Sequence, residues 1–271
     1  MIRVALCQTD TKRTAKENVE MIGRVVEKAV HEGGNVDVVV LPEDCYFDVD
    51  APGEGEGPEA LDGYFVTKTR EMARKHRVNL LPGTFMLKAE DGRHYNTALF
   101  INRDGEIIGR YDKMHLMKAM DYDESKHVVG GTAPTVIDTD FGRIGIMVCY
   151  DLRFPELARG MVQDGADILF VPAFFPVGSP LPPRTDHWDT LVNSAALLNL
   201  TYVVAVNQYG RLSKDNPFGR SCVVDPWGTV ITRCANRAEI AYATLDLDYQ
   251  AQVRQMIATW QNRLPAYYTL R

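Results

Sequence analysis

The sequence predicts an α/β fold with a mixed, partly antiparallel sheet. Short apolar segments recur along the chain, amphipathic helical segments separate some of them, and other apolar segments follow one another directly. The expected strands are 3–7, 36–41, 78–82, 97–101, 106–111, 143–148, 168–171, 202–206, 221–224 and 239–245. The expected helices are 18–31, 61–76, 155–163, 187–200 and 249–260.

Periodicity and turn residues support these elements in chain order. Segment 18–31 places apolar side chains on one helical face, and these are Val19, Ile22, Val25, Val26 and Val30. Segments 97–101 and 106–111 are separated by Asn-Arg-Asp-Gly, which predicts an antiparallel hairpin. Helix 155–163 begins with Pro155, whose ring suits a first helical turn.

Composition narrows the class of partner. The chain has 271 residues, 45% of them hydrophobic and 24% charged, and a net charge of −6. This acidic balance, without a basic cluster, disfavours nucleic acid or an anionic membrane as a partner. No apolar run approaches the roughly 20 residues that span a bilayer. The N-terminus resembles a strand and not a signal peptide.

The cysteines and histidines favour neither disulfides nor metal. The five cysteines are an odd number, lie far apart and include no CxxC pair, so we expect free thiols, no zinc and a cytoplasmic location. The six histidines do not stand at ligand spacing, so we expect neither a metal nor a cofactor. His115 and His187 are interpreted as structural hydrogen-bonding residues.

Two loops and one domain complete the organisation. Residues 48–58 form a polar loop with three alternating glycines, but no strand leads directly into it, so it is not a dinucleotide-binding motif. Residues 174–186 form a second loop, rich in proline. No repeat or linker divides the chain, and we expect one domain over 1–271.

Three reactive side chains stand where predicted strands end. They are Glu43, Lys113 and Cys149. Because functional sites in α/β folds gather at strand ends, a carboxylate, an ammonium and a thiol could meet there. Taken singly, Glu43 could be a solvated turn residue, Lys113 a surface charge and Cys149 a small buried hydrophobic residue.

The motifs around these residues resemble those of the nitrilase superfamily of carbon–nitrogen hydrolases. They read LPE at 41–43, YDKMHL at 111–116 and CYDLRFPE at 149–156, in the family's order. The resemblance runs nearly from end to end and includes further short segments: Gln8, 96–98, 124–126, 187–188 and 225–228. It implies a four-layer α-β-β-α sandwich with mixed sheets.

The resemblance implies that Glu43, Lys113 and Cys149 form a catalytic triad. Glu43 would be the general base, Cys149 the nucleophile that forms a thioester, and Lys113 with the backbone N–H of Tyr150 the oxyanion-binding groups. The resemblance also marks Glu124 as a second carboxylate close to the lysine, which helps to position substrate. By itself, Glu124 would be interpreted as a solvated helix or loop residue.

Arg153, four residues after the nucleophile, has two interpretations. In relatives that hydrolyse N-carbamoyl amino acids, an arginine at the matching place binds the substrate carboxylate, a task that suits a guanidinium group. Alternatively, Arg153 forms a structural ion pair with Glu156 or across a subunit contact.

The motifs are most similar to the Nit branch, which includes deaminated-glutathione amidase and ω-amidase. We therefore expect an amidase that releases ammonia or an amine from a small carboxylate-bearing amide. N-carbamoyl amino acid amidohydrolase is the alternative, and a nitrilase is disfavoured because those enzymes usually carry Trp where this chain has Tyr150. Hypotheses of other classes are a catalytically silent binding or scaffold subunit and an acyltransferase.

The resemblance also implies a homodimer or higher homo-oligomer, with the tail at 260–271 extending across a partner subunit. One segment departs from the family pattern. Relatives usually carry Arg-Ala-x-Glu-Asn in the helix after His-Trp, whereas this chain has Ala195 and Leu198 in place of the Arg and the Glu. We expect a repacked structural site there, because losing both members of a pair leaves no stranded charge.

Overall fold

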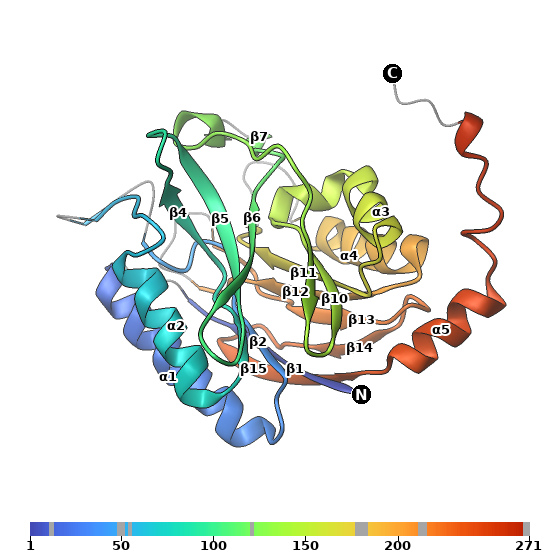
Figure 1. Cartoon of the computed structure of the whole chain (residues 1–271), viewed down its shortest axis with the longest axis horizontal. Coiled ribbons are helices and arrows are strands. Elements are labelled where there is room, and N and C mark those ends of the chain that lie inside the picture. The colour runs from blue at the N-terminus through green and yellow to red at the C-terminus, as the bar shows by residue number, and fades with distance from the viewer. Residues whose placement is uncertain are drawn as a thin grey trace.

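Two β-sheets stack face to face, and helices cover the outer face of each (Figure 1). This computed structural model describes residues 1–10, 14–47, 52–53, 56–119, 122–176, 184–210 and 216–267. The arrangement confirms the four-layer α-β-β-α sandwich with mixed sheets.

The first sheet has the order β15-β1-β2-β3-β5-β4, with β6 also paired to β5. Strands β1, β2 and β3 are parallel, and the others pair antiparallel. Its strands are β1 (Ile2–Gln8), β2 (Val38–Val40), β3 (Asn79–Leu81), β4 (Thr84–Lys88), β5 (His94–Ile101), β6 (Ile107–Asp112) and β15 (Glu239–Leu245). The expected hairpin is confirmed as β5 and β6.

The second sheet has the order β14-β13-β12-β11-β10-β9, with β10, β11 and β12 parallel. Its strands are β9 (Val136–Thr139), β10 (Gly142–Ile146), β11 (Ile168–Ala173), β12 (Tyr202–Asn207), β13 (Cys222–Val224) and β14 (Val230–Arg233). A separate short pair joins β7 (Lys118–Ala119) to β8 (Tyr122–Asp123).

Two helices lie on each outer face. Helices α1 (Ala15–Gly33) and α2 (Tyr64–His76) pack on the first sheet, and α3 (Pro155–Gln163) and α4 (Thr185–Asn199) pack on the second. Helix α5 (Leu247–Met256) follows β15. The short 3-10 turns are η1 (Glu124–Lys126), η2 (Cys149–Arg153) and η3 (Pro265–Tyr267).

Strand β1 shows why the central strands are apolar on both faces. Val4 and Leu6 belong to the core between the sheets, whereas Ala5 and Cys7 belong to the core beneath α1 and α2. Successive side chains of a strand point to opposite faces, and both faces are covered here. All four side chains are fully buried as a result.

The strands that the sequence analysis missed include the edge strands β4, β9 and β14. An edge strand has one neighbour and more solvent contact, so its apolar pattern can be weak, as in β14, which has no fully buried residue. This reason does not apply to β4, three of whose five residues are buried. The predicted helix at 249–260 is wrong at its end, because α5 stops at Met256 and Ile257 adopts an extended backbone.

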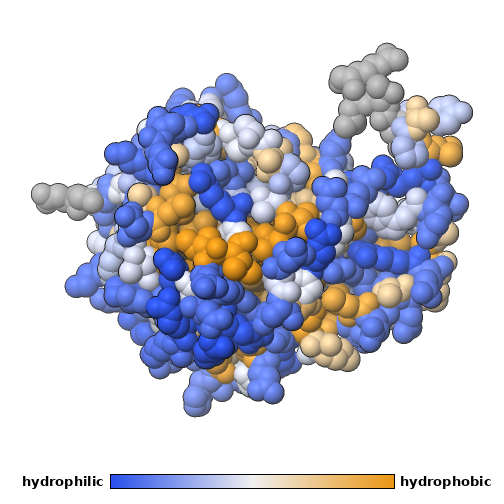
Figure 2. All heavy atoms as spheres, viewed as in Figure 1, coloured by the Kyte–Doolittle hydropathy of each residue, from blue (hydrophilic) through white to orange (hydrophobic). Residues whose placement is uncertain are grey.

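The segment after α5 continues past the edge of the sandwich (Figure 1), where Trp260 packs against the core and lies under the guanidinium of Arg159. The predicted partner-crossing tail, 260–271, includes this segment, but residues 268–271 lie outside the described part of the chain. Parts of the loops expected at 48–58 and 174–186 also lie outside it. In the face drawn in Figure 2, an apolar band crosses a largely hydrophilic surface over β5 and β6. Among the described residues, no helix combines the length and the apolar character needed to cross a bilayer.

Candidate active site

The structure brings Glu43, Lys113 and Cys149 together between the two sheets. Glu43 follows β2 and Lys113 follows β6 in the first sheet, whereas Cys149 follows β10 in the second. All three are buried. Lys113 Nζ lies 2.9 Å from Glu43 Oε1. The backbone of Phe174 contacts both Glu43 and Cys149. Its N–H donates to Glu43 Oε2 at 2.7 Å, and its carbonyl accepts from the Cys149 thiol at 3.4 Å.

Glu124 completes the environment of the lysine. Its carboxylate oxygens lie 3.0 and 2.8 Å from Lys113 Nζ. The backbone N–H of Met117 donates to the same carboxylate at 2.8 Å. The solvated alternative for Glu124 is therefore wrong, because its side chain is buried against the ammonium.

Asn96 is a site residue that the sequence analysis did not single out. It lies on β5, and its Nδ2 donates to Glu43 Oε1 at 2.9 Å and to Glu124 Oε1 at 3.1 Å. Asn96 thus bridges the two carboxylates that flank Lys113. The available signal was its place in the family-like segment 96–98, a polar residue just ahead of an apolar strand.

Cys149 occupies an unusual backbone conformation. Its φ is +46°, in the left-handed region that non-glycine residues rarely adopt. It opens the 3-10 turn η2, in which Tyr150 is the second residue. The first N–H groups of such a turn have no partner within it, so the N–H of Tyr150 is suited to meet an oxyanion. The strained backbone fits a functional position.

Burial and charge set the protonation of the thiol and the amine. Burial raises the pKa of the Cys149 thiol well above its ordinary value, and Glu43 adds to this while Lys113 opposes it. Burial alone would lower the pKa of Lys113, but Glu43 and Glu124 outweigh it and raise that pKa. At neutral pH the site therefore holds a neutral thiol beside a stable ammonium.

The loop that carries Glu43 is fastened to the second sheet. The side-chain amide of Gln208, which follows β12, donates to the backbone carbonyls of Glu43 at 2.6 Å and Asp44 at 3.0 Å. Together with the Phe174 contact, this bond fixes the carboxylate by groups outside its own sheet. Sequence patterns did not single out Gln208 or Phe174, because both act through tertiary contacts.

Arg153, in the same turn as Cys149, is half-buried. Its Nη2 lies 3.3 Å from His187 Nδ1, and its guanidinium lies over the rings of Tyr150 and Phe175. Within the described part of the chain it forms no ion pair with Glu156, so that part of the alternative is wrong, whereas an ion pair across a subunit contact stays a prediction. The hydrogen-bonding role expected of His187 is confirmed.

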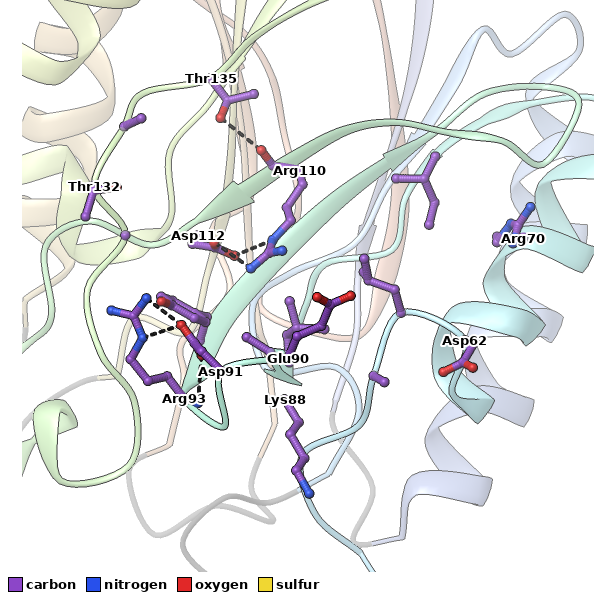
Figure 3. Close-up of a pocket in the computed structure, with 18 residues that line it drawn as sticks. Asp62, Arg70, Lys88, Glu90, Asp91, Arg93, Arg110, Asp112, Thr132 and Thr135 are labelled. Atoms are coloured by element: carbon purple, nitrogen blue, oxygen red, sulfur yellow. Dashed lines mark hydrogen bonds and ion pairs between the residues drawn. The ribbon is translucent and has the colours of Figure 1, made fainter.

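A hollow in the surface lies outside this site (Figure 3). It has a volume of about 1090 Å³ and opens beside β4, β5 and β6. Of the charged residues that line it, Arg110 pairs with Asp112 and Arg93 with Asp91, and none of the triad residues lines it. In the described ranges, no three His, Cys, Asp or Glu side chains form a group that could hold a metal ion.

Comparison with known proteins identifies the family. The carbon-nitrogen hydrolase family model matches residues 3–255. The chain is 34% identical to the nitrilase and fragile histidine triad fusion protein NitFhit of Caenorhabditis elegans, over 98% of this chain and 62% of that protein. It is 32% identical to deaminated glutathione amidase of Mus musculus, over 98% of this chain and 84% of the mouse protein.

A solved structure agrees with the sequence relatives. Saccharomyces cerevisiae Nit3, a member of branch 10 of the nitrilase superfamily, superposes with a TM-score of 0.83 at 30% identity, covering 94% of each chain. The fold, the length of the match and the relatives lead to the same result: this chain belongs to the carbon–nitrogen hydrolase family and is an amidase-type enzyme of the nitrilase superfamily.

Proposed function

We propose that Glu43, Lys113 and Cys149 hydrolyse a small, carboxylate-bearing amide through a thioester and release ammonia or an amine. The observation that carries this proposal is that the Glu43 carboxylate contacts the Lys113 ammonium and, through Phe174, is linked to the Cys149 thiol. One of its carboxylate oxygens faces the Lys113 ammonium, and the other is held by Phe174, whose carbonyl contacts the thiol. A base, a cation and a nucleophile are thus held within one water-poor site.

In the first half-reaction, Glu43 takes the proton of the Cys149 thiol as the sulfur attacks the amide carbon. The negative charge that develops on the carbonyl oxygen is met by the Lys113 ammonium and the Tyr150 N–H. One such donor typically contributes about 3–4 kcal/mol to the transition state. The C–N bond then breaks, the nitrogen takes the proton from Glu43, and ammonia or an amine leaves.

In the second half-reaction, water attacks the thioester. Glu43 takes a proton from the water, the same oxyanion groups stabilise the new tetrahedral intermediate, and the C–S bond breaks. The sulfur regains a proton and the carboxylic acid leaves. Because both halves balance with water and the chain's own residues, we propose no cofactor.

Arg153 supports a substrate that carries a carboxylate. Its guanidinium, held by the neighbouring rings and by His187, would bind that carboxylate in two parallel hydrogen bonds. The relatives named deaminated glutathione amidase agree with this class of substrate. The test is ammonia release from succinamate, glutaramate and α-ketoglutaramate, beside N-carbamoyl amino acids and nitriles.

Cys149→Ala should abolish ammonia release from every amide in this panel, because the variant has no nucleophile. Arg153→Ala should raise KM for amides with a free carboxylate and leave neutral amides unchanged. A wild-type protein that stays inert on the whole panel would favour a binding subunit. Transfer of the acyl group to an added amine, in preference to water, would favour an acyltransferase.

We also propose a homodimer, formed through the α4 face. Leu197 and Leu198 of α4 and the nearby Trp227 are about half exposed. The α-carbon of Gly228, next to Trp227, approaches Leu197, so the turn adjoins the helix. The expected repacking is wrong for Leu198, which faces solvent in the single chain.

Sedimentation velocity tests this assembly. Wild type should sediment as a dimer or larger oligomer, and Leu198→Asp should sediment as a monomer, because a charge would be buried against apolar groups. A monomeric wild type would contradict the proposal. The tail from residue 260 would add to the contact, since Leu264 and Tyr267 are exposed.

The free thiols of all five cysteines support a reducing cytoplasm as the location.

A further inference from the structure

Asp151 is a fully buried carboxylate that has no part in the reaction proposed above. It lies two residues after Cys149, within the turn η2. Its two oxygens accept four hydrogen bonds, which is about the full capacity of a carboxylate. A buried charge needs such bonds, because water cannot supply them.

Three of the four bonds come from the segment that carries Lys113. The Tyr111 hydroxyl donates to Oδ2 at 2.7 Å, and the backbone N–H of His115 donates to Oδ1 at 3.0 Å. His115 Nδ1 lies 2.7 Å from Oδ1, and it carries the proton because an ionised carboxylate only accepts. Tyr111 and His115 stand two residues before and after Lys113.

The phenol of Tyr111 is held as a donor. Burial, together with the adjacent Asp151 carboxylate, raises the pKa of this hydroxyl above its ordinary value. The hydroxyl therefore keeps its proton and its bond to Asp151 throughout the neutral pH range.

The fourth bond comes from the segment that carries the nucleophile. The backbone N–H of Val148 donates to Asp151 Oδ2 at 2.9 Å, and the Asp151 N–H donates to the Val148 carbonyl at 3.0 Å. This reciprocal pair closes a turn over Cys149 and Tyr150, the first of which has a φ of +46°. It holds a backbone conformation that would otherwise be unfavourable.

Aromatic packing joins the same two segments a second time. The His115 ring stacks on Phe154, with centroids 3.7 Å apart and planes 8° from parallel. The ring of Tyr150 packs edge-on against Phe154, with centroids 5.5 Å apart. The lysine segment of the first sheet and the cysteine turn of the second are thereby closed on each other.

We propose that Asp151 is a positioning residue, which holds Lys113 and Cys149 in register across the two sheets. The inference rests on the proposed function for the roles of that lysine and that cysteine. Without the carboxylate, the ammonium is displaced from the oxygen on which charge develops. The loss falls on kcat more than on KM, because the interaction matters in the transition state.

Two isosteric variants test the proposal, and one is the control. Asp151→Asn removes the charge and turns an amide N–H₂ toward a donor. The control, Asp112→Asn, removes a carboxylate from the residue next to Lys113. This carboxylate pairs with Arg110 and lines the hollow drawn in Figure 3. With succinamate, Asp151→Asn should lower kcat about 30–100-fold and change KM less than about 3-fold. Asp112→Asn should change kcat less than about 2-fold.

Alkylation of Cys149 by iodoacetamide, followed by mass spectrometry, gives a readout that needs no turnover. Lys113 lowers the pKa of the thiol, so its displacement should slow alkylation at pH 8. Asp151→Asn should slow the reaction strongly in wild type and much less in Lys113→Ala, because the part of its effect that passes through the lysine is then missing. A wild type that is alkylated yet releases no ammonia refutes the proposed function and leaves this test intact.

Circular dichroism melting separates positioning from folding. If Asp151→Asn does not fold, Tyr111→Phe is tested in its place. This variant removes one of the four donors to Asp151 and should still lower kcat several-fold. The proposal is overturned if the folded Asp151 or Tyr111 variant keeps the kcat of Asp112→Asn. It is also overturned if Asp151→Asn slows alkylation equally with and without Lys113.

Discussion

Two lysine–carboxylate pairs lie in one short stretch of this chain, and only one of them is part of the site. Lys113 pairs with Glu124 at 2.8 Å, and Lys118 pairs with Asp123 at 3.0 Å. The side chains of the first pair are 3% and 9% exposed, whereas those of the second are 80% and 20% exposed. Nearly equal distances therefore accompany very different surroundings.

The difference shows that burial, and not the ion pair itself, gives the site its chemistry. In water the attraction between two such charges is weak, and it grows as the dielectric constant falls. At Lys113 two carboxylates overcome the cost of burial and keep the ammonium charged next to a neutral thiol. At Lys118 solvent keeps the ammonium charged, and the ion pair joins the strands β7 and β8.

The largest contrast should come from removing each lysine. Lys113→Ala should lower kcat for succinamate by about 10²–10³-fold, because an oxyanion donor is lost. It leaves Glu43 and Glu124 without their shared cation, and breaking such a buried pair costs about 3–5 kcal/mol of stability. Lys118→Ala should leave kcat and the melting temperature unchanged. Ammonia assays and thermal melts check both, and equal losses would refute the comparison.

Removing each acid should give a smaller contrast. Glu124→Gln keeps the shape of the side chain but turns an N–H₂ toward either Lys113 or the Met117 N–H, both of which are donors. We expect kcat to fall about 10–100-fold while the protein stays folded. Asp123→Asn is the matched control and should retain full activity. A fully active Glu124→Gln would exclude this carboxylate from the site.

The smallest effect should appear in the titration of the exposed pair. The Ser125 hydroxyl, next Lys118 and then the Ser125 N–H lower the pKa of Asp123 to about 2. A depressed pKa stabilises the fold above the unfolded value of about 3.9, and this stability is lost as pH falls through the folded pKa. NMR titration should show a midpoint near the folded value. Lys118→Ala should raise the pKa of Asp123 only part of the way to its unfolded value. A full return to that value would show that Ser125 contributes nothing.

The sequence predicted the central strands and the site residues at their ends well. Glu43 and Cys149 follow buried apolar runs, so local patterns locate them, whereas Lys113 follows the half-buried β6 and was located by the resemblance of its motif. The edge strand β14 was missed because its half-exposed side chains give no such run. Long-range contacts were also missed: the Phe174 N–H reaches Glu43 across 131 positions of the chain.

Asp151 illustrates the same limit inside a recognised motif. The octapeptide at 149–156 carries it, yet its partners Tyr111 and His115 come from the other sheet. No period or spacing in the sequence specifies that four donors will converge on one carboxylate. Such convergence is a property of the packed sandwich.

The position of the site between the sheets makes activity a measure of how those sheets are joined. In the proposed mechanism, the base Glu43 and the oxyanion-binding Lys113 follow strands of the first sheet, and the nucleophile Cys149 follows a strand of the second. Each sheet alone holds an incomplete set of reacting groups. Under the proposed mechanism, we therefore expect a slight separation of the two sheets to abolish activity while the helices and strands remain intact.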